Sequence, residues 1–422
     1  MRGVEEDESV LIEGKIVSYL TSSHQSIPDS FLLRGPDGLM FQVSISTIAS
    51  RGTAAQIVSN GLKYGDRVRI QGLLAPVGVD MRWINRAHIR ITPKGIEKIG
   101  DESELSHVDR VVRALYGIRA HIVERLIALF GPQRGGLLAG LIVEGGALLD
   151  SDTKKLFQKT GLSHIVALSG YNTSIIIDFS TMVLGAALPR RWRIVSTGGL
   201  AVLFCVMTGA SPPLLRASIM ALLRLLSDIT YRKFDAFRAL IFSACCIVAY
   251  NPFLIFYSLS FQLSFLATLG LIVYARSLQK LCAKIFLPNF IAQTLATTLA
   301  AQVYTLPLLV YRFHGLSIIS LLANVIVLPV IPLFMLGAAV SVGLSHLPVN
   351  LITAVVLHIW EKVLGGAIEV LLYVIKIMAD IKYAYVYASL HPAWMIVLWA
   401  VGIGIGAWLM RRPKSEPLQP SS

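Results

Sequence analysis

One arginine and a pair of opposite charges lie inside an apolar segment, and these side chains are the best placed to do chemistry. Residues 213–229 contain Arg216, Arg224 and Asp228 among apolar neighbours. Charged groups are costly in hydrocarbon, so they normally face a bundle interior or a watery path. Arg224 and Asp228 are four residues apart, which allows an ion pair along one helix. A buried arginine usually has a defined partner or substrate, so we take Arg216 as a candidate binding residue.

Hydroxyl and amide side chains recur at helical spacing in two further apolar segments, residues 253–274 and 286–310. The members are Ser260, Ser264 and Thr268 in the first segment, and Thr294, Thr298, Gln302 and Thr305 in the second. Such stripes either line a polar path or form hydrogen bonds between packed helices, as small polar residues commonly do. The spacing alone leaves both interpretations open.

The segment 161–177 combines a glycine with many polar side chains. It contains His164, Ser169 and Gly170, followed by Asn172. This composition predicts a broken or kinked helix, which a membrane tolerates only where the backbone is buried in protein or lines a cavity. A serine–histidine protease is a remote alternative. His164 and Ser169 are five residues apart, however, and therefore lie roughly on different faces of a helix.

Several kinds of enzymatic site have no signature in the sequence. The nine histidines are scattered, without metal-ligand spacing. The four cysteines form no Cys-x-x-Cys pair. No glycine-rich loop is followed by the lysine that would hold ATP phosphates. We therefore expect no enzymatic activity, no metal and no cofactor.

The elements that must hold these residues are membrane helices. The 422-residue chain is 55% hydrophobic and 15% charged, against about 25% charged residues in a typical soluble domain. A membrane crossing needs about 20 apolar residues, and nine apolar runs predict a polytopic helical domain over residues 161–411. The runs are 164–188, 194–210, 213–229, 237–250, 253–274, 286–310, 316–345, 352–378 and 391–410.

Basic segments separate alternate runs and predict the orientation of the chain. They lie at 190–193, 231–233, 276–284 and 411–414, and basic loops stay on the cytoplasmic side of a membrane. This places residues 412–422 in the cytoplasm as a tail and the N-terminal region outside. The net charge of +13 follows in part from these loops, with nucleic acid or anionic lipid as further explanations.

Residues 1–99 are predicted to form a small extracytoplasmic β domain. Short alternating segments and turn signals favour a barrel or sandwich, and residues 61–78 are typical of an oligonucleotide-binding (OB) barrel. Basic and aromatic side chains, which single-strand binding uses, gather in its later part. They are Arg67, Arg69, Arg82, Trp83, Arg86, His88 and Arg90. A solvated basic face near a membrane is the other interpretation.

The segment 100–160 connects the two predicted domains. Apolar residues at helical spacing over 100–135 predict an amphipathic helix on the membrane surface. Its basic side carries Arg110, Arg113, Arg119 and Arg125. Residues 135–149 are short and rich in glycine, which favours a re-entrant or interfacial segment.

Four blocks of the chain resemble the ComEC family of bacterial DNA-uptake channels. They read GLSHIVALSGYNTSIII at 161–177, TGASPPLLRASIMALL at 208–223, NPFLIFYSLSFQLSFLATLGL at 251–271 and AAQVYTLPLLVYRFHGLSIISLLANVIVLPVIPL at 300–333. The resemblance implies a multi-pass channel of the bacterial inner membrane that passes single-stranded DNA into the cytoplasm during natural transformation. The implied fold is an OB-like barrel followed by a polytopic α-helical competence domain.

The resemblance also implies which side chains line the path. They are His164, Ser169, Gly170 and Asn172 in the first block, Arg216 in the second, Gln262 and Ser264 in the third, and Pro307, Asn324 and Pro329 in the fourth, together with Gln302 of the stripe. Implied partners are single-stranded DNA, the lipid bilayer, a DNA receptor protein, a separate nuclease, and a cytoplasmic motor or single-strand-binding proteins.

The sequence departs from the family pattern in three ways. Many members have membrane helices before the barrel, whereas this sequence starts at the barrel. Many also have a metallo-β-lactamase-like domain after the helices, which we expect this form to lack. The family's Ser-Gly-Leu-His reads Ser-Gly-Tyr-Asn at 169–172. A transporter or flippase of another anionic substrate would use the same helices and basic loops, and this is the main alternative.

Overall fold

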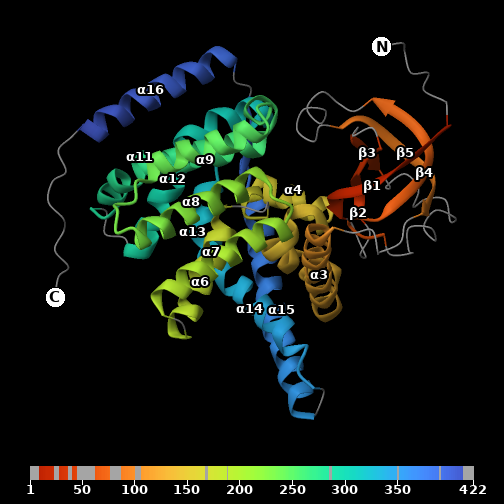
Figure 1. Cartoon of the computed structure of the whole chain (residues 1–422). Coiled ribbons are helices and arrows are strands. Elements are labelled where there is room, and N and C mark those ends of the chain that lie inside the picture. The colour runs from red at the N-terminus through yellow and green to blue at the C-terminus, as the bar shows by residue number, and fades with distance from the viewer. Residues whose placement is uncertain are drawn as a thin grey trace.

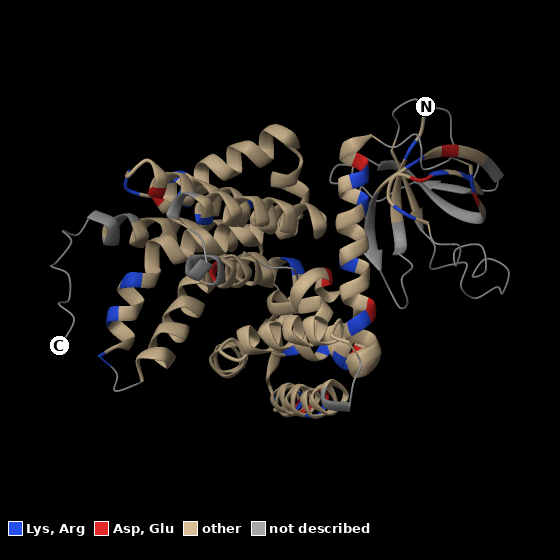
Figure 2. Cartoon of the chain, turned by 60° about the horizontal axis from the view of Figure 1, so that its bottom comes forward, with Lys and Arg blue, Asp and Glu red and all other residues tan. Residues whose placement is uncertain are grey.

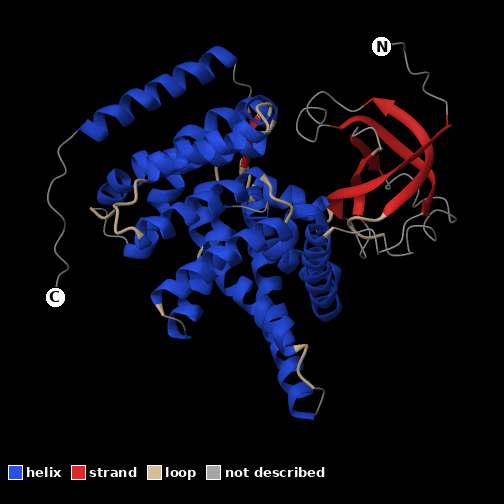
Figure 3. Ribbon diagram, viewed as in Figure 1, coloured by secondary structure: helices blue, strands red, loops and turns tan. Residues whose placement is uncertain are grey.

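The computed structural model has an N-terminal β-barrel beside a larger helical domain (Figure 1, Figure 3). It describes residues 9–22, 28–36, 40–44, 62–76, 87–99, 106–166, 170–187, 189–284, 288–348, 351–388 and 391–411. The multi-domain organisation predicted from the sequence is present, with strands first and helices after.

Five strands close into a barrel in the order β1-β2-β3-β5-β4. The strands are β1 (Ser9–Ser22), β2 (Pro28–Arg34), β3 (Met40–Ser44), β4 (Arg67–Pro76) and β5 (Ala87–Lys98). Neighbouring strands are antiparallel except β3 and β5, which run parallel. Alternating apolar residues such as Phe31, Leu33 and Ile70 fill the interior, as the period of two in a strand requires.

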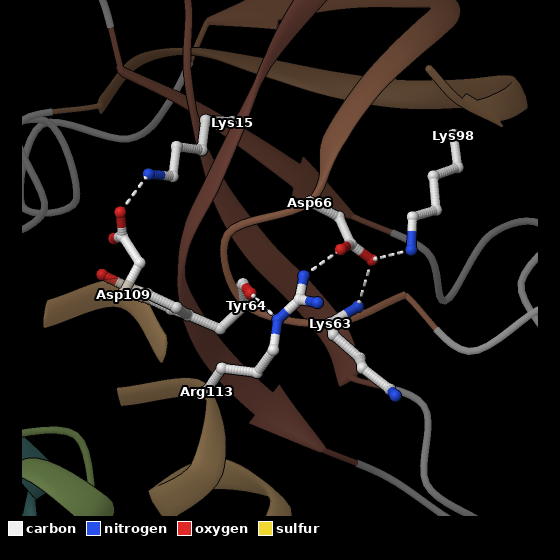
Figure 4. Close-up of polar contacts among 7 residues, drawn as sticks. All are labelled: Lys15, Lys63, Tyr64, Asp66, Lys98, Asp109 and Arg113. Atoms are coloured by element: carbon white, nitrogen blue, oxygen red, sulfur yellow. Dashed lines mark hydrogen bonds and ion pairs between the residues drawn. The ribbon is translucent and has the colours of Figure 1, made fainter. Parts of the chain in front are cut away.

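The barrel is held against the first long helix, α3 (His107–Ala139), by ion pairs (Figure 4). Asp66, only 3% exposed, accepts from the guanidinium of Arg113, lies 3.2 Å from Lys98 Nζ, and accepts from the backbone N–H of Lys63 at 2.8 Å. The Nε of Arg113 also donates to the carbonyl of Tyr64 at 2.8 Å. A buried carboxylate is stable only with such partners, so Asp66 fixes how the barrel sits on α3.

A second ion pair joins the same two elements, between Lys15 of β1 and Asp109 in the first turn of α3, at 2.6 Å. The side chain of Tyr64 stacks on Tyr116 of α3 with ring centroids 5.6 Å apart. Partial burial, and then the charge of Asp109, raises the pKa of Tyr64. The phenol therefore stays neutral at this interface.

Helix α3 is bent at Gly131, which has φ +80°, followed by Pro132. Both residues interrupt a regular helix. Beyond the bend, Leu137 and Leu138 are buried in the central apolar cluster of the helical domain. The chain continues as the π-helix η2 (Gly140–Glu144) and the 3₁₀ helix η3 (Gly145–Leu148).

Two of the four arginines that the sequence placed on a basic, lipid-facing side of this helix form ion pairs inside the protein instead. Arg113 binds Asp66 of the barrel, and Arg119 makes a two-point ion pair with Glu144, at 2.7 and 2.6 Å. These two side chains are used inside the protein because each has a buried carboxylate within reach. Residues 135–139 lie beyond the non-helical Gly131. A Cβ at Gly135 would lie 2.3 Å from the carbonyl oxygen of Leu126, so the chain folds back on itself here. The re-entrant or interfacial position of residues 135–149 stays a prediction.

The remaining elements form the helical domain. In chain order they are α4 (Ser151–Lys159), α5 (Ser163–Val166), α6 (Gly170–Ala187), α7 (Arg190–Met207), α8 (Pro212–Ile229), α9 (Ala236–Tyr250), α10 (Leu254–Tyr257), α11 (Leu259–Cys282), α12 (Asn289–Phe313), β6 (Gly315–Ser317), α13 (Ser320–Val327), α14 (Ile331–Leu344), α15 (Leu351–Asp380), β7 (Tyr385–Tyr387) and α16 (Pro392–Arg411). Strands β6 and β7 pair antiparallel and form a small second sheet.

Close helix packing builds the interior of this domain. Helices α11 and α12 approach so closely at Gly270 that a Cβ there would lie 2.1 Å from the carbonyl oxygen of Ala300. Such small-residue contacts are typical of membrane helix pairs. Helix α16 crosses over this pair at the edge of the domain (Figure 1), with Trp399 donating to the carbonyl of Tyr304 at 3.0 Å.

The outer surface of the helical domain is apolar. On α16, Ile396, Val401, Ile403 and Trp408 are each more than half exposed, and Figure 2 shows few charged residues along most of these helices. A soluble domain rarely leaves a contiguous apolar surface of this size. Together with the apolar helices, this marks a membrane domain.

Within the described residues, three helices are long and apolar enough to cross a membrane: His107–Glu144, Leu259–Cys282 and Asn289–Phe313. The pair α13 and α14, bent by 44° between them, gives a fourth if it counts as one span. The nine predicted crossings and the outside position of the barrel stay predictions. Breaks explain part of the difference, because the run 316–345 is divided between α13 and α14 and the run 253–274 between α10 and α11.

Replacing Asp66 with Asn should loosen the barrel from α3. The substitution leaves the guanidinium of Arg113 without its carboxylate, and breaking a buried ion pair costs about 3 kcal/mol. Thermal unfolding of the full chain in detergent should show a lower midpoint, and limited proteolysis should cut faster between the two domains. Asp152→Asn, which removes an exposed carboxylate from α4, is the control. Equal behaviour of the two variants would show that Asp66 does not hold the barrel.

Candidate functional site

The four sequence blocks meet in space around Gly170. The first contact joins Gly170, the first described residue of α6, to Arg216 of α8. A Cβ at residue 170 would lie 2.1 Å from Arg216 Nη2 and 3.5 Å from the Cβ of Ala217. Only glycine leaves room for the guanidinium here. The first block therefore accommodates the Arg216 side chain of the second block through the missing side chain of Gly170.

The guanidinium of Arg216 also contacts the third block. Its Nη1 donates to the carbonyl of Ser264 and to the hydroxyl of Thr268, both on α11. The Thr268 hydroxyl in turn donates to the Ser264 carbonyl at 2.9 Å. One turn of α11 therefore supplies both acceptors. We call Gly170, Arg216, Ser264 and Thr268 the arginine cluster.

Neutral oxygens are the partners of Arg216. Its Nε has no hydrogen-bond partner and its charge has no carboxylate partner in the described part of the chain. Carbonyl and hydroxyl dipoles stabilise a guanidinium but leave its positive charge unneutralised. An anion with planar or tetrahedral oxygens, above all a phosphate, is the complementary ligand.

The first block reaches the fourth block through a second close approach. Gly161 has φ +72°, and a Cβ there would lie 2.5 Å from the Cβ of Ser320 at the start of α13. The hydroxyl of Ser320 accepts from Gln302 Nε2 of α12 at 3.2 Å. His164, on the same turn as Gly161, donates from Nδ1 to the Gly161 carbonyl at 3.1 Å. His164 and Gln302 thus lie on either side of one glycine–serine contact.

Asn172 of α6 forms hydrogen bonds with two other segments of the chain. It is 1% exposed, and its Nδ2 donates to the carbonyls of Leu141, at 3.1 Å, and Ile165, at 3.4 Å. Leu141 belongs to the π-helix η2, where widened turns commonly mark functional sites. The interruption predicted within 161–177 stays a prediction, because residues 167–169, between α5 and α6, lie outside the described residues. Ser169 lies between them, outside the described residues.

A buried amide lies near the bend of the fourth block. Asn324 is 4% exposed, and its Oδ1 has no partner among the residues that the structure describes. Pro329 stands at the 44° break between α13 and α14, where the Tyr171 hydroxyl donates to the carbonyl of Leu328 at 3.5 Å. Pro307 is buried inside α12.

Gln262 has a local structural contact. Its Nε2 donates to the carbonyls of Ile255, at 2.7 Å, and Phe256, at 3.1 Å, which satisfies the C-terminal end of the short helix α10. Ser258 caps the next helix by accepting from the Phe261 N–H at 3.2 Å. The position of Gln262 in the path stays a prediction. In the structure, the amide nitrogen of Gln262 donates to the carbonyls of Ile255 and Phe256.

The ion pair that the spacing of Arg224 and Asp228 allows does not form within the described residues. Both side chains are on the exposed side of α8. Asp228 lies instead with Arg193 of α7 at a cavity between helices. The i, i+4 spacing allowed the pair, but tertiary packing gave Asp228 a different environment.

On the barrel, Arg67 and Arg69 share the outer face of β4, as their alternation predicted. Arg69 pairs with Glu13 at 2.6 Å and Glu97 at 3.6 Å, so its charge is partly offset. Its hydrogen bond with Glu13, followed by the Glu13 charge, raises the pKa of Arg69. Arg82, Trp83 and Arg86 lie outside the described residues. His88 and Arg90 lie on β5, but their side chains are not described.

Two parts of this site were not predicted from the sequence. The sequence placed Thr268 only in a stripe of hydroxyl side chains and did not predict its direct contact with Arg216. The contact of Gly161 with Ser320 was not expected, because nothing in two sequence positions so far apart indicates that they meet. A glycine directly after the capped helix α4 was the available signal, since helices commonly end at glycine.

A family model described as "Competence protein" matches residues 141–413, well over half of the chain. ComE operon protein 3 of Bacillus subtilis (strain 168) is 26% identical over 225 residues, which cover 53% of this chain and 28% of that protein. An uncharacterized protein of Aquifex aeolicus (strain VF5) is 28% identical over 206 residues, 48% of this chain and 46% of its own length. The matches thus span less than half of these relatives. No solved structure matches.

Gly170→Ala should disturb the arginine cluster. The new methyl group would lie on the Arg216 guanidinium, and overpacking of this kind costs about 2 kcal/mol. The matched control is Gly199→Ala on α7, where a Cβ would meet nothing within 4 Å. Thermal unfolding in detergent should separate the two variants.

The shorter side chain of Arg216→Ala should relieve part of the Gly170→Ala penalty in the double variant. The coupling energy from the double-mutant cycle measures this directly. Purely additive effects would mean that the two residues do not touch.

Proposed function

The chain belongs to the competence protein family, and from that premise we propose that it is a membrane channel that passes single-stranded DNA into the cytoplasm during natural transformation. The family supports a role in DNA uptake, and the apolar helices support a multi-pass membrane protein. The channel itself, its strand selectivity and its direction are our proposal. The bacterial plasma membrane is the proposed location, with the barrel outside.

The arginine cluster is the observation that carries this proposal. Arg216 is held between α6 and α11 by its close contact with Gly170 and by neutral oxygens. A positive charge without a carboxylate attracts a passing phosphate, whereas a neutralised charge would not.

A single such contact suits passage better than tight binding. Conduction requires a ligand to enter and also to leave, so contacts along the path must be weak and repeated. Hydroxyl and amide groups such as Gln302 and Asn324 offer hydrogen bonds without adding charge. This combination favours a polyanion that moves through the protein over an anion that is retained.

We further propose that the barrel is an OB fold that receives the strand. Its order β1-β2-β3-β5-β4, with the parallel β3–β5 pair, is the one expected of a five-stranded Greek-key barrel. Such barrels bind single strands through basic and aromatic side chains. In this proposal Arg67 is a phosphate contact on β4, while Arg69 contributes less because Glu13 and Glu97 offset its charge.

Strand separation and driving force would come from other proteins. A DNA receptor, a nuclease that degrades one strand, and a cytoplasmic motor or single-strand-binding proteins are the proposed partners. We assign no catalytic residue to this chain. Within the described residues no group of three or more metal-ligating side chains occurs, and the proposed path needs none.

Arg216→Ala should abolish uptake of labelled DNA in transformable cells that carry this variant as their only copy. The protein should still insert, as measured by membrane fractionation. Arg216→Lys should restore part of the uptake, since it keeps the charge but loses the fork geometry. Arg224→Ala, which removes an exposed arginine from the same helix, is the control. Normal uptake in Arg216→Ala would rule out the arginine cluster as the path.

The full chain in lipid nanodiscs should bind labelled single-stranded DNA more tightly at low salt. Each lost phosphate contact reduces the slope of log affinity against log salt by about 0.7, so Arg67→Gln should show a shallower slope. Lys155→Gln, on the exposed face of α4, should not. Absence of single-strand binding at low salt would favour a transporter of another anion, such as a lipid headgroup.

A further inference from the structure

A cavity of about 290 Å³ lies between α6, α7 and α8, apart from the arginine cluster. Among the described residues, its lining includes Thr181, Arg193, Ile194, Thr197, Leu225 and Asp228. They come from the end of α6, the first turns of α7 and the last turns of α8. The cavity therefore lies where three helices of the membrane domain begin or end.

An unsatisfied hydroxyl forms part of its wall. Thr197 is 1% exposed, and its Oγ1 has no hydrogen-bond partner in the part of the chain that the structure describes. A buried hydroxyl without a partner costs free energy. The neighbouring Gly198 packs against Leu222 and Leu225 of α8, so Thr197 is fixed beside the cavity. A ligand with an acceptor oxygen would satisfy it.

Among the described lining residues of the cavity, one side chain is positive and one is negative. Arg193 lies on α7 and Asp228 on α8, and both are in its wall. Asp228 also interacts with other groups of the chain, so a ligand would share its carboxylate oxygens. The complementary ligand carries an anion and an ammonium group a short distance apart.

Exposed apolar side chains stand next to the lining residues in the sequence of all three helices. Met182 of α6 is 67% exposed, Trp192 of α7 is 65% exposed, and Ile229 of α8 is 47% exposed. Tryptophan is enriched where membrane helices meet the headgroup region. A polar cavity beside an apolar surface fits a molecule with a polar head and hydrocarbon chains.

We propose that this cavity binds the headgroup of phosphatidylethanolamine. Arg193 holds the phosphate, Asp228 accepts from the primary ammonium, and the Thr197 hydroxyl donates to a phosphate or ester oxygen. Ile194 and Leu225 contact the ethanolamine carbons, and the acyl chains lie along the exposed apolar side chains. Lipid binding at this cavity does not depend on DNA passage, so it can be tested separately from the proposed channel.

Three phospholipids with identical acyl chains separate this proposal from a general affinity for lipid. The delipidated full chain in detergent is titrated with phosphatidylethanolamine, phosphatidylglycerol or phosphatidylcholine, and bound lipid is counted by native mass spectrometry. Phosphatidylethanolamine should bind most tightly. Phosphatidylglycerol lacks the ammonium, and the trimethylammonium of phosphatidylcholine cannot donate a hydrogen bond to Asp228.

Two variants test the assigned roles. Asp228→Asn should weaken phosphatidylethanolamine binding about tenfold, as loss of one charge-assisted hydrogen bond does, and should leave phosphatidylglycerol unchanged. Arg193→Gln should weaken both lipids. The matched controls are Asp152→Asn and Arg238→Gln, which remove exposed charges of each sign and should change neither lipid.

Soluble phosphoethanolamine serves as the last probe, because it has the headgroup without the chains. Binding at lipid concentrations or below would show a site for a free small molecule and would overturn the lipid assignment. Equal affinity for the three lipids, or an unchanged preference in Asp228→Asn, would also overturn it. A preference for phosphatidylethanolamine that Asp228→Asn removes would establish the site, whatever the uptake assay of the channel shows.

Discussion

The helical domain depends on the accommodation of one positive charge among neutral oxygens. Arg216 could not approach α6 if residue 170 had a side chain, and its Nη1 would lose both acceptors if α11 lacked the carbonyl of Ser264 and the hydroxyl of Thr268. Three helices are therefore fixed relative to one another by a group that is costly to bury. Cost of this kind is tolerated where a protein gains specificity or function from it, and the position of the charge is consistent with an anion path.

A second buried charge plays a comparable part at the domain boundary. Asp66 joins the barrel to α3 through Arg113, with Lys98 as a further partner. Helix α3 then bends at Gly131 and enters the core of the helical domain. The barrel is thus connected mechanically to the region around η2, which Asn172 links to the start of α6.

Local patterns allowed much of the fold to be predicted. Alternation placed the strands of the barrel and the shared outer face of Arg67 and Arg69, and hydrophobic runs placed most of the later helices. Contacts between distant segments could not be read in this way. The partners of Arg113 and Arg119, the pairing of Arg69 with Glu13, and the meeting of Gly161 with Ser320 all depend on tertiary packing. The expected pair of Arg224 and Asp228 shows the converse, since favourable spacing on a helix did not produce a contact.

The small sheet of β6 and β7 joins two segments that are far apart in the sequence. Gly315–Ser317 pairs with Tyr385–Tyr387, so its hydrogen bonds close a loop of about 70 residues, and closing a loop of that size carries an entropic cost before any contact rewards it. The segment between the two strands contains α13, α14 and α15. The strand pairing therefore ties the two ends of this three-helix segment together, so that these helices cannot separate from one another without breaking the sheet as well.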